Sequence, residues 1–163
     1  GLVNAGSLAP GDTIYSGKKV QFKPMPQFAP EAFRILRAKS LGKYKAFRKG
    51  LEQLAAEGVV QILKNEARGD ASPVMAAVGP MQFEVMQARM EFEYNVETVT
   101  EPIPYSVARR TDAESAPELG RQRGVEIFTR QDGELIALFG DKWKLAFIEK
   151  EHPELTMETL VAD

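Results

Sequence analysis

The sequence predicts an α+β fold, and three observations support that prediction. Two stretches repeat apolar residues every three or four positions, as amphipathic helices do, at about 41–57 and 80–93. Short apolar or alternating runs typical of strands stand on both sides of each stretch. Glycine and proline separate these runs from one another. Residues 32–101 therefore read strand-helix-strand-strand-helix-strand, which is the element order of the ferredoxin-like split βαβ sandwich.

The first predicted helix, at about 41–57, follows a partly alternating strand at 33–37. Its apolar residues fall at steps of three and four and so share one face: Tyr44, Phe47, Leu51, Leu54 and Ala55. Glycine inside a helix costs about 1 kcal/mol relative to alanine, so Gly50 indicates a close packing contact. Gly58 is placed to end this helix, and an apolar strand at 59–63 follows it.

The second predicted helix begins after a polar loop and a short apolar strand at 74–78. Pro80 suits the first position of a helix, and Phe83, Met86 and Met90 give that helix an apolar face. The alternation at 96–100 predicts a fourth strand, which ends at the prolines that follow. We expect two helices on one face of an antiparallel four-stranded sheet.

The rest of the chain predicts a second, smaller unit in the order strand-helix-strand-strand-helix. A possible strand at 105–110 and a short polar helix at 113–123 precede a hairpin whose turn is Gln131-Asp132-Gly133. Asp141 is placed to cap the final helix. The last ten residues are expected to be frayed or held at a sheet edge.

The predicted organisation of the chain has four parts. Residues 1–23 read as two or three short strands, and residues 24–31 carry three of the ten prolines, which favours an extended connector. Residues 32–104 form the predicted ferredoxin-like half. Residues 105–163 form the second α+β half.

The composition leaves few kinds of chemistry. The chain has no cysteine, which excludes disulfides, thiol catalysis and cysteine-based zinc sites. Its single histidine, His152, stands at a predicted helix end, where a solvated residue is expected. Gly6 and Gly11 have the spacing of a phosphate-binding loop, but Asp12 stands where that loop needs lysine. No apolar run approaches the roughly 20 residues needed to span a bilayer. We therefore expect no catalytic residue, no metal site, no cofactor in this chain and no membrane partner.

The charge of the chain is unevenly distributed. The 21 Lys+Arg and 23 Asp+Glu give a net charge of -2. Between residues 18 and 50, however, ten basic residues stand with one acidic residue, so this segment carries +9 and the remainder −11. Such a segment suits contact with the phosphates of structured RNA, and the alternative is a solvated face paired to acids elsewhere. Aromatic residues do not interleave with the charges, which favours phosphate contact over base stacking.

Several segments together resemble a known family. In chain order they are Gly11-Asp12-Thr13, Pro26-Gln27-Phe28-Ala29-Pro30-Glu31, Phe33-Arg34, Arg48 to Gln61, Ala77 to Val85, and Glu93 to Glu97. In order and spacing they are similar to the peptide chain release factor 3 family, which are bacterial translational GTPases of the elongation factor G class. The likeness covers residues 1 to about 110 and is faint beyond Arg110. The family typically has Ala-Arg followed by an aromatic residue, where this chain has Ala108-Arg109-Arg110.

The resemblance implies a C-terminal fragment of such a factor. Residues 1–23 would be the end of its β-barrel domain, and the GTPase domain that holds GTP and Mg²⁺ would lie upstream. The fragment would then be a non-catalytic, cytoplasmic domain that binds the ribosome and promotes release and recycling of class I release factors. Its expected partners are rRNA, ribosomal proteins, and the parent factor's own GTPase and barrel domains.

With this implication, ribosome docking becomes the favoured hypothesis for the basic segment. Charge alone selects the candidate contacts, and no family motif assigns them: Arg34, Arg37, Lys43, Lys45, Arg48, Lys49 and Arg109. The alternative function is a ferredoxin-like, ligand-binding regulatory domain, since one fold supports many functions.

Overall fold

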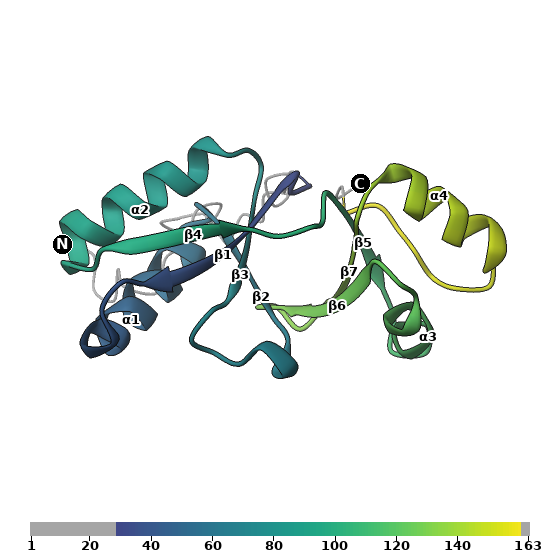
Figure 1. Cartoon of the computed structure of the whole chain (residues 1–163), viewed down its shortest axis with the longest axis horizontal. Coiled ribbons are helices and arrows are strands. Elements are labelled where there is room, and N and C mark those ends of the chain that lie inside the picture. The colour runs from purple at the N-terminus through teal and green to yellow at the C-terminus, as the bar shows by residue number, and fades with distance from the viewer. Residues whose placement is uncertain (1–28, 161–163) are drawn as a thin grey trace, which may run out of the picture.

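A single seven-stranded antiparallel sheet connects all the residues that the computed structural model describes, which are 29–160. The strand order is β4-β1-β3-β2-β6-β7-β5. The predicted barrel remnant, most of the predicted connector and the Gly6–Gly11 loop lie outside the described residues. Figure 1 shows helices α1 and α2 at one end of the molecule and α3 and α4 at the other.

The order of elements in both halves is as predicted. The first half contains β1 (Ala32–Ala38), α1 (Tyr44–Ala56), β2 (Gln61–Lys64), β3 (Val74–Ala77), α2 (Met81–Tyr94) and β4 (Thr98–Pro102). The second half contains β5 (Val107–Thr111), α3 (Ala116–Arg121), β6 (Val125–Arg130), β7 (Leu135–Phe139) and α4 (Lys142–Glu151). Two short 3₁₀ helices, η2 (Leu41–Lys43) and η3 (Glu66–Arg68), lie before α1 and after β2. The α+β class is thus confirmed.

Several boundaries differ from the prediction. The first turn of the expected helix at 41–57 is the 3₁₀ helix η2, and α3 begins three residues later than expected. Tyr44 is exposed, although its spacing predicted a place on the buried face. It stands in the first turn of α1, outside the first core, with its ring centroid 6.4 Å from that of Phe47.

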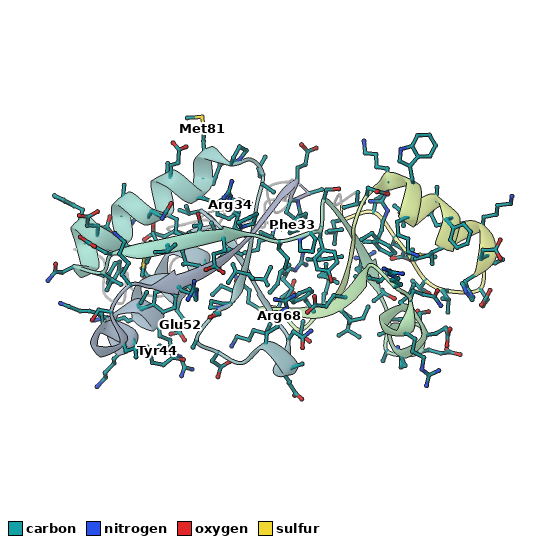
Figure 2. The ribbon with its side chains drawn as sticks, in the orientation of Figure 1. Phe33, Arg34, Tyr44, Glu52, Arg68 and Met81 are labelled. Carbon is teal, nitrogen blue, oxygen red and sulfur yellow. The ribbon has the colours of Figure 1, made fainter. Side chains whose placement is uncertain are left out.

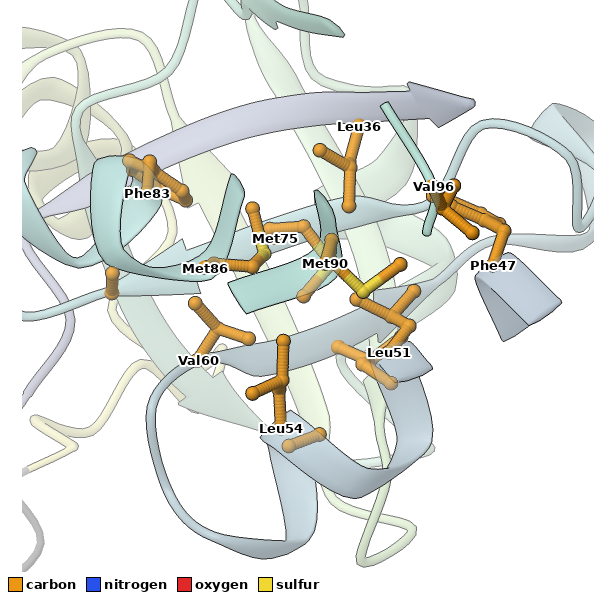
Figure 3. Close-up of a cluster of buried hydrophobic side chains, with 13 residues drawn as sticks. Leu36, Phe47, Leu51, Leu54, Val60, Met75, Phe83, Met86, Met90 and Val96 are labelled. Atoms are coloured by element: carbon orange, nitrogen blue, oxygen red, sulfur yellow. The ribbon is translucent and has the colours of Figure 1, made fainter. Parts of the chain in front are cut away.

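The first hydrophobic core lies between the sheet and helices α1 and α2 (Figure 3). Helix α1 buries Phe47, Leu51 and Leu54 there, and α2 buries Phe83, Met86 and Met90, as their spacing predicted. Strand residues complete the cluster, among them Leu36, Val60, Ile62, Met75, Ala77 and Val96.

The second core lies on the other face of the strands of the first half and joins that half to the second. Strand side chains alternate between faces, so Met75 and Ala77 enter the first core while Val74 and Ala76 enter the second. Residues of both halves meet in it: Phe33, Leu63, Val74, Ala76, Ile103, Ala108, Phe128, Ile136 and Leu138. A third core, including Leu119, Phe139, Leu145 and Ile148, lies under α3 and α4.

Three local predictions are confirmed in detail. A Cβ on Gly50 would lie 2.7 Å from Met90 Sδ and 2.8 Å from the Tyr94 ring, so α1 and α2 make the expected close contact there. Gly58 ends α1 with a φ of 78°. The Asp141 side chain accepts a hydrogen bond from the Lys144 N–H at 2.7 Å and caps α4. After α4, the segment around Glu158 is held at the sheet edge by two backbone bonds between Arg110 and Glu158, at 2.8 and 2.9 Å.

A polar network joins the two halves beside the short β2–β6 pairing. The Glu126 carboxylate accepts hydrogen bonds from Arg68 at 2.5 and 2.7 Å, from the Tyr105 hydroxyl at 2.9 Å and from the Asn65 amide at 3.0 Å. The bond from Arg68 is the main cause that holds the pKa of Glu126 below its ordinary value, against the opposing effect of burial. The carboxylate form is therefore the one that the folded state favours.

Replacing Glu126 with glutamine should destabilise the protein in a pH-dependent way. We expect a loss of about 1–3 kcal/mol in the free energy of unfolding near neutral pH, because Arg68 loses a charged partner. The folded-state pKa lies below the unfolded one, so this stabilisation is lost as the pH falls below about 4.3 and through the folded-state pKa.

Urea denaturation at neutral and acid pH measures this difference. The gap between the parent protein and Glu126→Gln should narrow as the pH falls. The exposed pair of Glu118 with Arg121 supplies a matched control, and Glu118→Gln should change stability by less than about 1 kcal/mol. A gap that stays constant from neutral to acid pH would show that the carboxylate charge does not stabilise the fold.

Candidate nucleic-acid interface

Four of the predicted RNA-contact residues lie together at the start of α1. Lys43 stands directly before the helix, and Lys45, Arg48 and Lys49 follow within its first two turns. All four are exposed, because Phe47, Gly50, Leu51 and Leu54 occupy the inner face of the helix. Lys45 and Lys49 are four residues apart and so lie one above the other on the outer face. We call Lys43, Lys45, Arg48 and Lys49 the α1 basic surface.

The four cations of this surface differ in whether a carboxylate already pairs with them. Arg48 Nε donates to Glu52 Oε1 at 3.1 Å, one turn further along α1. That hydrogen bond is the main cause of a raised pKa for the Arg48 guanidinium. Lys43, Lys45 and Lys49 form no ion pair with any residue in the range 29–160. The three lysines can therefore meet an anion without first giving up an ion pair to any residue from 29 to 160.

Arg34 and Arg37 do not share a surface. They are three residues apart on β1, and successive strand side chains point to opposite faces. Arg34 lies on the helix-covered face, with its guanidinium carbon 6.0 Å from the centroid of the Phe83 ring (Figure 2). Arg37 belongs to the other face and pairs with Glu101 of the neighbouring strand β4. The odd spacing within a strand was the signal that could have separated them.

Arg109 lies in the other half of the molecule. It belongs to β5, the last strand in the sheet order, and is half-buried. Its Nη1 donates to the carbonyl oxygen of Ala108 at 2.9 Å. It lines an open hollow together with Lys142 and Glu149. The structure therefore does not bring Arg109 to the α1 basic surface.

A small cavity beside the α1 basic surface was not expected from the sequence. It encloses about 60 Å³ between α1 and the loop that contains η3. Its lining includes Tyr44, Arg48 and Arg68, of which Tyr44 and Arg68 are labelled in Figure 2. In the sequence, the residues of this loop are recognisable only as polar. Their contact with α1 could not be predicted, because it depends on the pairing of β2 with β3. The cavity has room for one small group.

Metal binding and membrane insertion have no counterpart among the described residues. Within the range 29–160, no group of three or more His, Cys, Asp or Glu side chains is placed to hold a metal ion. In that same range, no helix is both long and apolar enough to cross a membrane.

The family of the chain follows from its sequence relatives. Residues 22–149 match the family described as "Class II release factor RF3, C-terminal domain". The chain belongs to this family. The α+β fold described above is therefore that of a release-factor C-terminal domain.

Individual relatives carry the name peptide chain release factor 3. The protein from Synechococcus elongatus is 41% identical over 162 residues, or 98% of this chain, and the one from Trichodesmium erythraeum is 42% identical over 159 residues, or 96%. The protein from Trichormus variabilis is 40% identical over 162 residues. The chain spans about 30% of the length of these relatives. The resemblance drawn from motifs is confirmed, and the likeness continues past Arg110.

Proposed function

We propose that this chain acts as the non-catalytic C-terminal domain of a translation-termination GTPase. It binds the ribosome in the cytoplasm and promotes release and recycling of class I release factors. GTP, Mg²⁺ and the chemistry of hydrolysis belong to the GTPase domain of the whole factor. That GTPase domain and the barrel domain are also partners of this chain. The membership in the release factor 3 family supports this proposal.

The proposed domain organisation has support from the sheet. Residues 32–104 would be a ferredoxin-like half, since β4-β1-β3-β2 are neighbours in that order and antiparallel, with α1 and α2 packed over one face. Residues 105–163 would be the second α+β half, and residues 1–23 the end of the barrel domain.

The α1 basic surface is the part of the chain that we infer contacts ribosomal RNA. The observation that carries this inference is the set of exposed lysines on α1 without ion partners among residues 29–160. A lysine that meets a phosphate releases condensed counterions, so each contact strengthens binding and makes it sensitive to salt. Arg37 lies on the sheet face opposite α1, Arg34 lies over Phe83, and Arg109 is in the other half. We therefore leave these three arginines out of the proposed contact.

Reversing two charges on α1 should weaken ribosome binding strongly. The Lys45→Glu/Lys49→Glu variant should bind purified bacterial ribosomes about 10- to 100-fold more weakly, and the slope of log affinity against log salt should fall by about 2. Co-sedimentation over a series of salt concentrations measures both quantities. The matched control is Lys142→Glu/Lys150→Glu on α4, which should stay within about threefold of the parent chain.

Two results would count against the docking surface. One is equal loss in the α1 and α4 variants, which would indicate attraction by overall charge. The other is binding that does not change with salt. In the full-length factor, the α1 variant should also slow the dissociation of a labelled class I release factor from the ribosome.

The ligand-binding alternative has less support. The cavity beside α1 measures about 60 Å³, well below the roughly 300–1,000 Å³ of ordinary small-molecule sites. The hollow lined by Arg109, Lys142 and Glu149 measures about 610 Å³, within that range, but it is open to solvent.

A further inference from the structure

Helix α2 carries a second apolar stripe on its solvent side. Met81, Val85, Ala88 and Phe92 follow one another at steps of four, three and four, so they form one line along the helix. The buried residues Phe83, Met86 and Met90 occupy the opposite side. Met81 is 71% exposed to solvent, Val85 46% and Phe92 91%. We call Met81, Val85, Ala88 and Phe92 the α2 outer stripe.

The fold does not need this stripe. Other contacts already hold α2 in place: the inner residues in the first core, the close approach at Gly50, and the bond from Gln87 Nε2 to the Thr98 carbonyl oxygen at 3.1 Å. In Figure 2, Met81 points away from the body of the molecule. Single exposed apolar residues are ordinary, whereas a continuous line of them marks a contact surface. Ala88 in the middle of the line leaves space for the close approach of another helix.

Charge on α2 narrows the kind of partner that fits. Glu84 and Glu91 are seven residues apart and lie along the same flank of the outer stripe. Neither carboxylate forms an ion pair within residues 29–160. Arg89, the one cation of α2, is occupied by Glu57 at 2.5 Å and Glu93 at 2.7 Å. An apolar stripe with an acidic flank repels phosphate and attracts a cationic, partly apolar protein segment.

We propose that the α2 outer stripe binds a basic amphipathic helix of a protein partner. The apolar side of that helix would cover Met81, Val85, Ala88 and Phe92, and its lysines or arginines would meet Glu84 and Glu91. Helix-in-groove recognition uses the same i, i+4, i+7 anchors. The stripe spans about three helical turns, so a partner helix of about 10–14 residues is sufficient. The site lies on a different helix from the α1 basic surface and does not depend on RNA binding there.

Model peptides test the chemistry of the partner directly. One fluorescent helical peptide carries leucines at i, i+4, i+7 and i+11 flanked by lysines, and its sibling carries glutamates in place of the lysines. Fluorescence anisotropy with the 163-residue chain should show at least about tenfold tighter binding of the lysine peptide. Phe92→Gln and Val85→Gln should each weaken that binding about five- to tenfold. Glu84→Lys/Glu91→Lys should reverse the preference between the two peptides.

Matched controls separate a local effect from a loss of folding. All the substituted side chains are exposed, so circular dichroism should not change. Phe147→Gln removes an exposed phenyl ring from α4 instead, and it should leave peptide binding unchanged. The α1 variant Lys45→Glu/Lys49→Glu, in which ribosome binding is expected to weaken, should bind the lysine peptide as tightly as the parent chain does. The two proposals can therefore fail independently.

Four outcomes would overturn the proposal. The first is equal binding, or no binding, of the two peptides. The second is a dimer in analytical ultracentrifugation that Phe92→Gln dissociates, which would assign the stripe to a second copy of the chain. The third is loss of affinity for ribosomal RNA in Phe92→Gln. The fourth is an intramolecular cross-link from a benzophenone side chain at position 85 in the full-length factor.

Discussion

Replacing Phe128 with alanine is expected to lower the free energy of unfolding by about 3–5 kcal/mol. Phe128 is 1% exposed and lies in the second core, where residues of both halves meet. Its ring also lies 5.9 Å from the guanidinium carbon of Arg68. Truncation removes the buried ring and leaves a cavity between the halves, which cannot close without moving β3 or β7. Urea denaturation followed by circular dichroism measures the loss.

Phe147 supplies the control for this prediction. It is also a phenylalanine but stands exposed on α4, so Phe147→Ala should change stability by about 0.5 kcal/mol or less. If Phe128→Ala were as mild as Phe147→Ala, the two halves would not share a core in solution.

Replacing Gly50 with alanine is expected to destabilise the protein by about 2 kcal/mol, although alanine is the better helix former. The added Cβ would lie 2.7 Å from Met90 Sδ and 2.8 Å from the Tyr94 ring, closer than van der Waals contact allows. Separating α1 from α2 to relieve this overlap costs about 3 kcal/mol, at the upper end of overpacking costs, because both contacts are below 3 Å. The gain of about 1 kcal/mol in helix propensity leaves a net loss of about 2 kcal/mol. Thermal or urea unfolding gives the sign.

Gly42 supplies a matched substitution of the same chemistry. A Cβ there would meet only Ser40 Oγ, at 3.8 Å, and the backbone is not in the left-handed region. Gly42→Ala should therefore be neutral or stabilise the protein by up to about 1 kcal/mol. The contact between α1 and α2 would be looser than described if both alanine variants changed stability in the same direction.

Helices α1 and α2 carry opposite charges, although the net charge of the chain is only -2. Over its length, α1 carries Lys45, Arg48 and Lys49 with one acid, Glu52, whereas α2 carries one paired arginine and three glutamates. The two helices cover the same core, so surfaces of opposite charge lie on neighbouring helices. On the proposals above, α1 contacts RNA and α2 contacts a basic protein helix.

Much of the secondary structure could be predicted because its causes are local. The buried residues of α1 and α2 lie three or four positions apart, and the Asp141 cap acts on a backbone N–H three residues away. The close packing contact at Gly50 could be predicted because glycine inside a helix costs about 1 kcal/mol relative to alanine. The limits of these signals are also local: Tyr44 has the correct spacing for the buried face, but it stays 37% exposed in the first turn of α1 and lines the cavity there.

The candidate site could be predicted only in part. Charge alone grouped Arg34 with Arg37, whereas strand alternation separates them, and Arg109 lies on the last strand of the sheet. Four of the seven candidate residues lie together because they belong to one helix and its cap. The α2 outer stripe was not predicted, because Phe83, Met86 and Met90 already account for an apolar face at helical spacing.

Local patterns in the sequence were sufficient to predict the family, the order of helices and strands, and the absence of cysteine chemistry. They could not show that both halves share one sheet and meet in the second core, or which charges are already paired. The difference lies in how far apart the interacting residues stand along the chain. Caps and helical faces depend on residues three or four positions apart, whereas Arg37 with Glu101 and Arg68 with Glu126 are 64 and 58 positions apart. No local pattern contains such pairs, and strand pairing alone brings them together.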